Sequence, residues 1–196
     1  HENVFYFSSE HPISDVMSGM DYFNWDVRKH LEEEKFDFID AYSPRFYNVL
    51  PKQLVSDVSA KDFLKRGTDS LNLLKGTATE ARTNKYRGVV DSISYFLRSY
   101  ELNNVLNVIE IISSMGKATG AVHLLLMTSG MHEPIVENNM KHICDGVIEF
   151  RMKERGSEVE HSILLRKMRG MIVPNRTISY VITNKGVELE TTTGVL

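Results

Sequence analysis

Acidic and hydroxyl side chains end three apolar stretches of the sequence. These ends are Asp91 and Ser92 in residues 87–94, Glu10 in residues 4–10, and Thr128 and Ser129 in residues 121–129. Short continuous apolar runs of this kind are typical of buried parallel strands. Because open α/β sheets bind ligands just outside the carboxyl ends of their strands, the sequence predicts a ligand site at this edge of a sheet.

The same side chains also have an ordinary structural interpretation. An aspartate directly after a strand, such as Asp91, commonly caps the turn that follows, and an acid such as Glu10 commonly flanks the start of a helix. From residues 87–94 alone, the cap is the simpler interpretation. The order of strands and helices along the whole chain has to decide between a cap and a ligand site.

Strands and helices alternate over the first two thirds of the chain, which would bring the strand ends together. Residues 36–42 resemble a further strand, nearer the edge of the sheet. Apolar residues at three- and four-residue spacing predict helices over 13–23, 25–34, 68–86 and 103–115, the last stopped by Gly116. Residues 133–142 read as a helix or an ordered loop, and residues 45–66 as a long connection.

The pattern changes to alternation near the C-terminal end. Residues 146–152, 159–167 and 177–182 alternate, with turn signals at 155–157 and 184–186, which predicts an antiparallel meander. The predicted class is therefore α/β, with a mostly parallel sheet flanked by helices and a C-terminal antiparallel β-meander. The 196 residues, 42% of them hydrophobic, fit a single domain over residues 1–196.

Composition gives no support for several classes of function. The net charge is −3 with Lys and Arg scattered, so neither nucleic acid nor an anionic membrane is indicated as a partner. The seven histidines form no zinc-binding pattern, and Ser129-Gly130 lacks the Gly-x-Ser-x-Gly elbow of serine hydrolases.

The lone cysteine and the absence of long apolar runs indicate the compartment. Cys144 has no cysteine with which to pair, and we expect it to be a small buried hydrophobe rather than a nucleophile. Neither a signal peptide nor an apolar run of transmembrane length is present in the sequence. We therefore expect a cytoplasmic location.

Six short motifs in order resemble the KaiC-like branch of the RecA/RadA superfamily of ATPases. They are Tyr-Phe-Ser-Ser-Glu-His at 6–11, Asn-Trp-Asp at 24–26, Phe-Ile-Asp-Ala at 38–41, Val-Val-Asp-Ser-Ile-Ser at 89–94, Asp-Gly-Val-Ile at 145–148 and Lys-Met-Arg-Gly at 167–170. Residues 89–94 resemble the Walker B strand of that family. The resemblance extends from Val4 to about Leu189 and implies a RecA-like fold.

The resemblance implies roles for the strand-end residues. Asp91, with Ser92, would act through the Mg²⁺ shell of bound ATP, since carboxylate and hydroxyl oxygens suit that cation. Glu10 would polarise the attacking water. Thr128 or Ser129 resembles the polar sensor of the γ-phosphate. ATP and Mg²⁺ are therefore the implied cofactors.

The resemblance also implies an assembly. Lys167 and Arg169 lie two residues apart on an extended strand and so point the same way. In the family such residues reach the nucleotide of an adjacent subunit and stabilise phosphoryl charge. This implies a homo-oligomer, a ring or a filament. Apart from the resemblance, the two side chains would be solvated residues on a meander strand.

Two departures from the family pattern leave two hypotheses open. The phosphate-binding loop Gly-x-x-x-x-Gly-Lys-Ser/Thr (the P-loop) is absent from the 196 residues, and His11 stands in place of the second acid of a Glu-Glu pair. In the first hypothesis, the P-loop with its strand and helix lies immediately before His1, and the chain belongs to an ATPase. In the second, the chain is a P-loop-less regulatory or assembly module, without ATPase activity, that self-associates or binds a partner protein.

Overall fold

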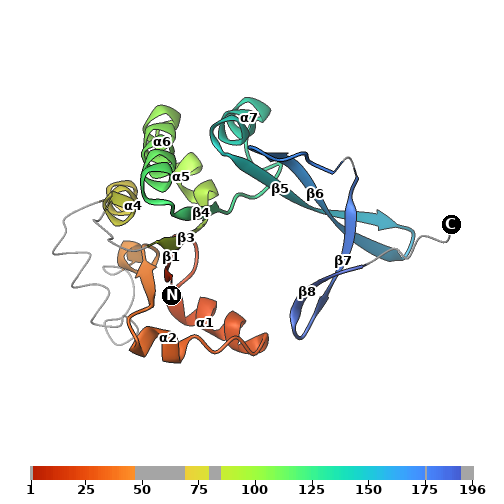
Figure 1. The fold of residues 1–196 in the computed structure, drawn as a ribbon, viewed down its shortest axis with the longest axis horizontal. Coiled ribbons are helices and arrows are strands. Elements are labelled where there is room, and N and C mark those ends of the chain that lie inside the picture. Colours follow the sequence, from red (N-terminus) through yellow and green to blue (C-terminus); the bar gives the residue numbers. More distant parts are fainter. Residues whose placement is uncertain (1, 47–68, 80–84, 175, 191–196) are drawn as a thin grey trace.

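A computed structural model describes residues 2–46, 69–79, 85–174 and 176–190 (Figure 1). The chain forms a parallel sheet with helices around it, followed by a separate antiparallel sheet (Figure 1). The predicted fold class is thus confirmed. The connection predicted over residues 45–66 begins with the 3-10 helix η1 (Ser43–Phe46) and otherwise lies outside the described residues.

The first sheet has four parallel strands in the order β2-β1-β3-β4. Their bounds are β1 Asn3–Ser8, β2 Phe36–Asp40, β3 Tyr86–Asp91 and β4 Val122–Leu125. The register pairs Ser8 with Asp40 on one side and with Asp91 on the other. Three strands therefore end level with one another, as the prediction of a shared sheet edge requires.

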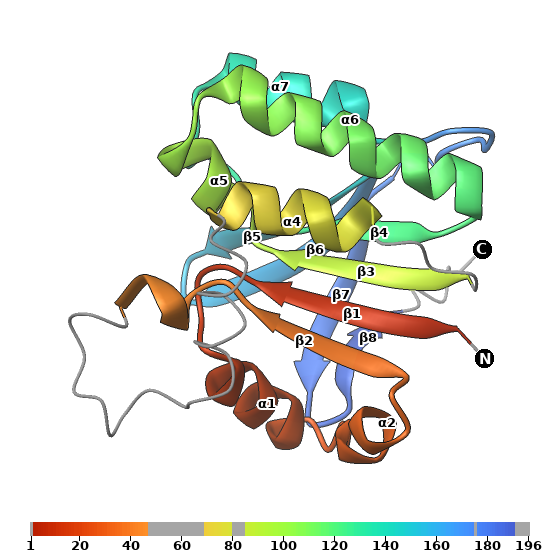
Figure 2. The ribbon, with the colours of Figure 1, turned by 90° about the vertical axis from the view of Figure 1, so that its left-hand side faces the viewer.

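One face of this sheet carries the hydrophobic core. Phe5, Phe7, Tyr86 and Val90 alternate along β1 and β3 and are at most 1% exposed. Helices α4 (Ser70–Thr79), α5 (Ile93–Ser99) and α6 (Leu102–Thr119) supply the other side of this core, which Figure 2 shows from a second direction. Burying a side chain of this size contributes about 1.5–3 kcal/mol, so the core fixes the register that aligns the strand ends.

The end of α6 differs from the prediction. Gly116 does not stop the helix, which continues to Thr119 and ends at Gly120 in the left-handed conformation, with φ 74°. Gly116 lies in a closely packed part of the helix, where a Cβ would be 3.2 Å from the carbonyl oxygen of Ala121. Helices α1 (Ile13–Tyr22) and α2 (Arg28–Glu32) lie beside β2 and have no buried residue.

The second sheet follows helix α7 (Pro134–Ile143) and has the order β5-β6-β7-β8. Its antiparallel strands are β5 Gly146–Arg155, β6 Glu158–Met168, β7 Ile178–Thr183 and β8 Gly186–Leu189. The β7–β8 turn packs against Trp25. Gly186 in this turn has φ 109°, and a Cβ there would lie only 3.1 Å from the indole ring. No described helix is long and apolar enough to cross a bilayer.

Candidate functional site

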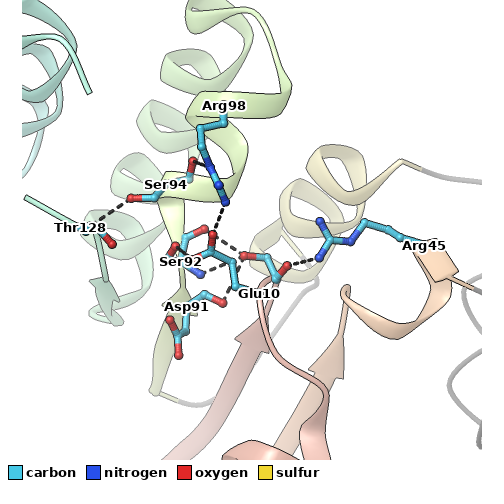
Figure 3. Close-up of polar contacts among 8 residues, drawn as sticks. Glu10, Arg45, Asp91, Ser92, Ser94, Arg98 and Thr128 are labelled. Atoms are coloured by element: carbon cyan, nitrogen blue, oxygen red, sulfur yellow. Dashed lines mark hydrogen bonds and ion pairs between the residues drawn. The ribbon is translucent and has the colours of Figure 1, made fainter. Parts of the chain in front are cut away.

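Ser9 joins the ends of β1 and β3. Its backbone N–H donates to the carbonyl oxygen of Asp91 over 2.7 Å, which continues the sheet by one residue. Its Oγ accepts from the N–H of Ser92 at 2.9 Å and donates to the carbonyl oxygen of Ser92 at 3.0 Å. The peptide bond between Asp91 and Ser92 is cis. The hydrogen bonds of Ser9 hold Glu10, the next residue, beside Asp91 and Ser92 (Figure 3).

Each carboxylate oxygen of Glu10 accepts a hydrogen bond. Oε2 accepts from Oγ of Ser92 at 2.5 Å, and Oε1 accepts from a guanidinium nitrogen of Arg98 (Figure 3). The Glu10 side chain is 25% exposed, so it is partly accessible to solvent. Glu10 is thus neither a helix cap nor a free surface acid.

Asp91 is held by a tyrosine from the neighbouring strand. The hydroxyl of Tyr6 donates to Oδ2 of Asp91 over 2.5 Å. Burial, and then the hydrogen bond and negative charge of Asp91, raise the pKa of Tyr6 above its ordinary value of 10.0, so the phenol stays a donor at neutral pH. The second oxygen, Oδ1, accepts no hydrogen bond from the described residues.

This donor set fits Mg²⁺ that arrives with a nucleotide. Among the described residues, no group of three or more His, Cys, Asp or Glu side chains is placed to hold a metal. Mg²⁺ in nucleotide sites keeps several waters and takes one or two carboxylates plus phosphate oxygens. Asp91, with one oxygen fixed by Tyr6, meets that requirement, whereas a metal held by protein ligands alone would need more donors.

The acid at the end of β2 has a structural role. Oδ1 of Asp40 accepts from the backbone N–H groups of Tyr42 and Ser43 at 2.9 and 2.8 Å, which caps η1. Arg45, in η1, then lies 4.0 Å over the ring of Tyr95 and donates to the carbonyl oxygen of Ser9 over 2.5 Å (Figure 3). The capping interpretation considered for Asp91 therefore applies to Asp40.

Thr128 and Ser129 lie in an exposed segment after β4. The strand ends at Leu125, earlier than predicted, although the N–H of Leu126 still donates to the carbonyl oxygen of Val90 at 3.0 Å. The N–H of Thr128 donates to Oγ of Ser94 over 3.0 Å (Figure 3). Thr128 is thus linked through α5 to the residues around Glu10.

Lys167 and Arg169 make contacts elsewhere in the chain. Nζ of Lys167 donates to the carbonyl oxygens of Lys141 and His142 at 3.2 and 2.8 Å, at the end of α7. Nε of Arg169 lies 3.0 Å from Oδ1 of Asp145. The described contacts therefore bring together Glu10, Asp91 and Ser92 but do not bring Lys167 or Arg169 to them.

Sequence reasoning missed the residues that orient the two acids: Tyr6, Ser9, Arg45, Ser94 and Arg98. Tyr6 and Ser9 flank the strand end in the sequence, but only the register of β1 against β3 shows what they contact. Arg98 and Ser94 lie on α5, a helix that follows Ser92 directly and that the apolar pattern did not predict.

Comparisons with known proteins agree with this fold. The sequence profile of a protein family described as "ATPase: KaiC" matches residues 1–193. A UPF0273 protein of Saccharolobus solfataricus is 29% identical over 188 residues, which cover 94% of this chain and 63% of that protein. A UPF0273 protein of Sulfurisphaera tokodaii is 24% identical over 193 residues, which cover 95% and 64%. The chain thus spans just under two thirds of the length of these two relatives.

A solved structure shows the same fold. The crystal structure of a KaiC-like protein from Pyrococcus horikoshii superposes with a TM-score of 0.64 over 97% of this chain and 77% of that chain. The two sequences are 21% identical there, so the likeness establishes the architecture and leaves the chemistry to be argued from the residues.

Proposed function

The chain belongs to the KaiC ATPase family, and on this premise we propose that it forms most of an ATPase domain that binds and hydrolyses Mg²⁺-ATP at the ends of β1, β3 and β4. In this proposal hydrolysis is coupled to assembly or regulation in the cytoplasm. The observation that carries the proposal is the placement of Glu10 beside Asp91 and Ser92, with Ser92 donating to Glu10 over 2.5 Å.

The two acids suit different tasks in this reaction. Asp91 would hold the water shell of Mg²⁺ with the oxygen that Tyr6 leaves open. Glu10 would accept a hydrogen bond from the attacking water and so orient it toward the γ-phosphate. Thr128 or Ser129 would contact the γ-phosphate from the next strand end. Bound Mg²⁺ would neutralise charge on the phosphates while these residues place the water.

The P-loop of this domain would lie upstream of His1. Within the described residues β4 has one strand neighbour, β3, so its other edge is open. Val122, Leu124 and Leu126 are 47%, 57% and 44% exposed, although parallel sheets are normally covered on both faces. A further strand and its helix beside β4 would cover this surface and bring the amide cradle of the P-loop next to Asp91.

Lys167 and Arg169 would serve the site of a neighbouring subunit. Their present partners are the end of α7 and Asp145, on the second sheet's side of the molecule. An assembly in which subunits contact head to tail, as a ring or filament, would offer both cations a phosphate in place of these partners. The proposed state is therefore a homo-oligomer.

Hydrolysis measurements on the full-length protein test this proposal. We expect Mg²⁺-dependent release of phosphate from ATP, lost in EDTA, and lowered about 10²- to 10⁴-fold by Glu10→Gln because the water then lacks its acceptor. Asp91→Ala should also abolish this Mg²⁺-dependent hydrolysis, because the Mg²⁺ shell then loses its carboxylate. Asp40→Asn is the matched control, since Asn also caps helices and Asp40 ends a neighbouring strand away from the reacting groups.

The opposite result would favour the second hypothesis. A full-length protein that binds no Mg²⁺-ATP in calorimetry, but binds a partner protein or self-associates, would be a module without ATPase activity. ATP hydrolysis that Glu10→Gln and Asp91→Ala leave unchanged would place the reaction at another site.

A further inference from the structure

We propose that Arg98 is a positioning residue for Glu10, and that it fixes the orientation in which Glu10 receives the attacking water. The inference rests on the proposed function and extends it to a residue outside all six motifs. Its basis is the ion pair of Arg98 with Oε1 of Glu10, which complements the hydrogen bond from Ser92 to Oε2 (Figure 3).

The position of α5 explains how Arg98 reaches the strand ends. The helix begins at Ile93, directly after Ser92, so its N-terminal end lies at the site. Side chains in a helix lean toward its N-terminus, which directs the long side chain of Arg98 from the last turn back toward Glu10. Nε of Arg98 donates to the carbonyl oxygen of Ser94 over 3.3 Å on the way and steadies this path.

Two donors leave Glu10 oriented but not blocked. A carboxylate presents about four lone-pair sites on two oxygens, so one donor at each oxygen leaves room for a water. Charge-assisted hydrogen bonds from a planar guanidinium are strong and directional. Without Arg98, Glu10 would keep only the Ser92 hydroxyl and would rotate about its side-chain bonds, because its position after the strand is partly exposed.

Ser94 ties this arrangement to the candidate γ-phosphate sensor. Its carbonyl oxygen accepts from Arg98, and its Oγ accepts from the N–H of Thr128 at 3.0 Å. One residue of α5 therefore contacts both the segment that follows β4 and the side chain that orients Glu10. The water-orienting acid and the sensor thus keep a fixed spacing, which an in-line attack on a phosphoryl group requires.

An ion pair that serves only stability would behave differently. Arg98 and Glu10 have side chains that are 50% and 25% exposed, and a pair of this exposure adds little to the stability of a fold. Arg87 and Glu2 form a comparable pair at the opposite end of β3, with nitrogen and oxygen 2.8 Å apart and side chains 41% and 39% exposed. Arg87→Ala is therefore the matched control for Arg98→Ala.

The test measures steady-state ATP hydrolysis by the full-length protein and its variants. We expect Arg98→Ala to lower kcat about 10- to 100-fold, the range found when a residue that orients an active group is removed, with KM for ATP within about twofold. Arg98→Lys should recover part of the loss, and so should guanidine added to Arg98→Ala. Arg87→Ala should leave kcat unchanged.

A double variant shows whether Arg98 acts on kcat through Glu10. If Arg98 acts through Glu10, Arg98→Ala added to Glu10→Gln should lower kcat less than twofold further, because effects of residues that act as a unit are not additive. The positioning role would be overturned, with the ATPase activity still standing, by any of three results. The kcat losses of the two substitutions could multiply in the double variant, Arg98→Ala could leave kcat unchanged, or it could change only KM for ATP. A full-length protein that neither binds nor hydrolyses ATP would overturn both proposals.

Discussion

The hydroxyl of Tyr6 and the carboxylate of Asp91 share a hydrogen bond of 2.5 Å between adjacent parallel strands. The register pairs Tyr6 with Val89 and Ser8 with Asp91, so the tyrosine and the aspartate lie diagonally on one face of the sheet. Burial raises the pKa of Tyr6 first, and the nearby negative charge raises it further, so the phenol remains protonated. The orientation of Asp91 is therefore set by the sheet itself.

Tyr6→Phe should lower the free energy of unfolding by about 1–3 kcal/mol, because a carboxylate then loses a hydrogen bond within a partly buried site. Urea denaturation followed by circular dichroism measures this change. Tyr22→Phe is the matched control, since Tyr22 is 76% exposed, and it should change stability by less than about 0.5 kcal/mol. Equal effects of the two substitutions would mean that the Tyr6 hydroxyl contributes nothing.

Two glycines should respond with opposite signs to the same substitution. A Cβ at Gly88 would lie 2.5 Å from Cζ of Phe5 and 2.7 Å from Cδ2 of His123, and Phe5 is fully buried. Gly88→Ala should therefore destabilise the fold by about 1–3 kcal/mol through overpacking. Among the described residues, no atom outside the neighbouring backbone of α4 lies within 4 Å of a Cβ at Gly76. Gly76→Ala should stabilise by about 0.5–1 kcal/mol, because alanine favours a helix. Thermal unfolding of both variants checks the signs.

His123 should make stability depend on pH. Its ring packs against Phe5 and Tyr86, its Nε2 is buried without a hydrogen bond to the described residues, and burial lowers its pKa from 6.5 to about 4. Between these values the unfolded chain binds a proton that the folded chain does not, so stability falls as the pH falls from 6.5 toward 4. The loss should be about 1–2 kcal/mol, since the ring keeps some access to solvent.

His123→Leu should remove this component of the pH dependence. The comparison concerns the change in unfolding free energy between pH 7 and pH 4, measured with urea at each pH, so a constant packing difference between the two side chains cancels. His30, on α2, is exposed, and His30→Leu should leave the slope as it is in the unsubstituted protein. A slope that His123→Leu does not reduce would show that other groups take up the proton.

Periodicity in the sequence predicted most of the elements because burial and chain order determine them. Short continuous apolar runs predicted β1 and β3, and the three- and four-residue spacing of apolar residues in 103–115 predicted α6. The end of α6 was misplaced because a glycine can also lie inside a helix: Gly116 does so, and Gly120, in the left-handed conformation, ends the helix. The alternation near the C-terminal end indicated the antiparallel meander, but not that its strands form a sheet separate from the parallel one.

The site was predictable as far as the acids, and no further. Glu10 and Asp91 end apolar runs, so their proximity follows from parallel strands. Tyr6, Arg98 and Ser94 depend on register and on a helix of seven residues, α5, whose apolar pattern is too short to recognise. Orientation of a side chain is a tertiary property, and sequence spacing within one element does not specify it.

Lys167 and Arg169 provide a test of the proposed assembly by mixing subunits. Glu10→Gln should inactivate the subunit's own site, and Lys167→Ala should inactivate the site of its neighbour. If the lysine acts across the interface, a mixture of the two variants contains sites with an intact Glu10 and an intact lysine. Random assembly from equal amounts would form such sites at about a quarter of all interfaces, so about a quarter of the unsubstituted activity should return.

The matched control is a mixture of Glu10→Gln and Asp91→Ala. Both acids belong to one subunit's strand ends, so every site in that mixture lacks one of them and no activity should return. The comparison also separates the proposed role of Lys167 from its bonds to the carbonyl oxygens of Lys141 and His142. If Lys167→Ala acted only by loosening α7, the defect would stay within its own subunit. That subunit would then gain nothing from a Glu10→Gln neighbour, and the absence of recovery would contradict a role between subunits.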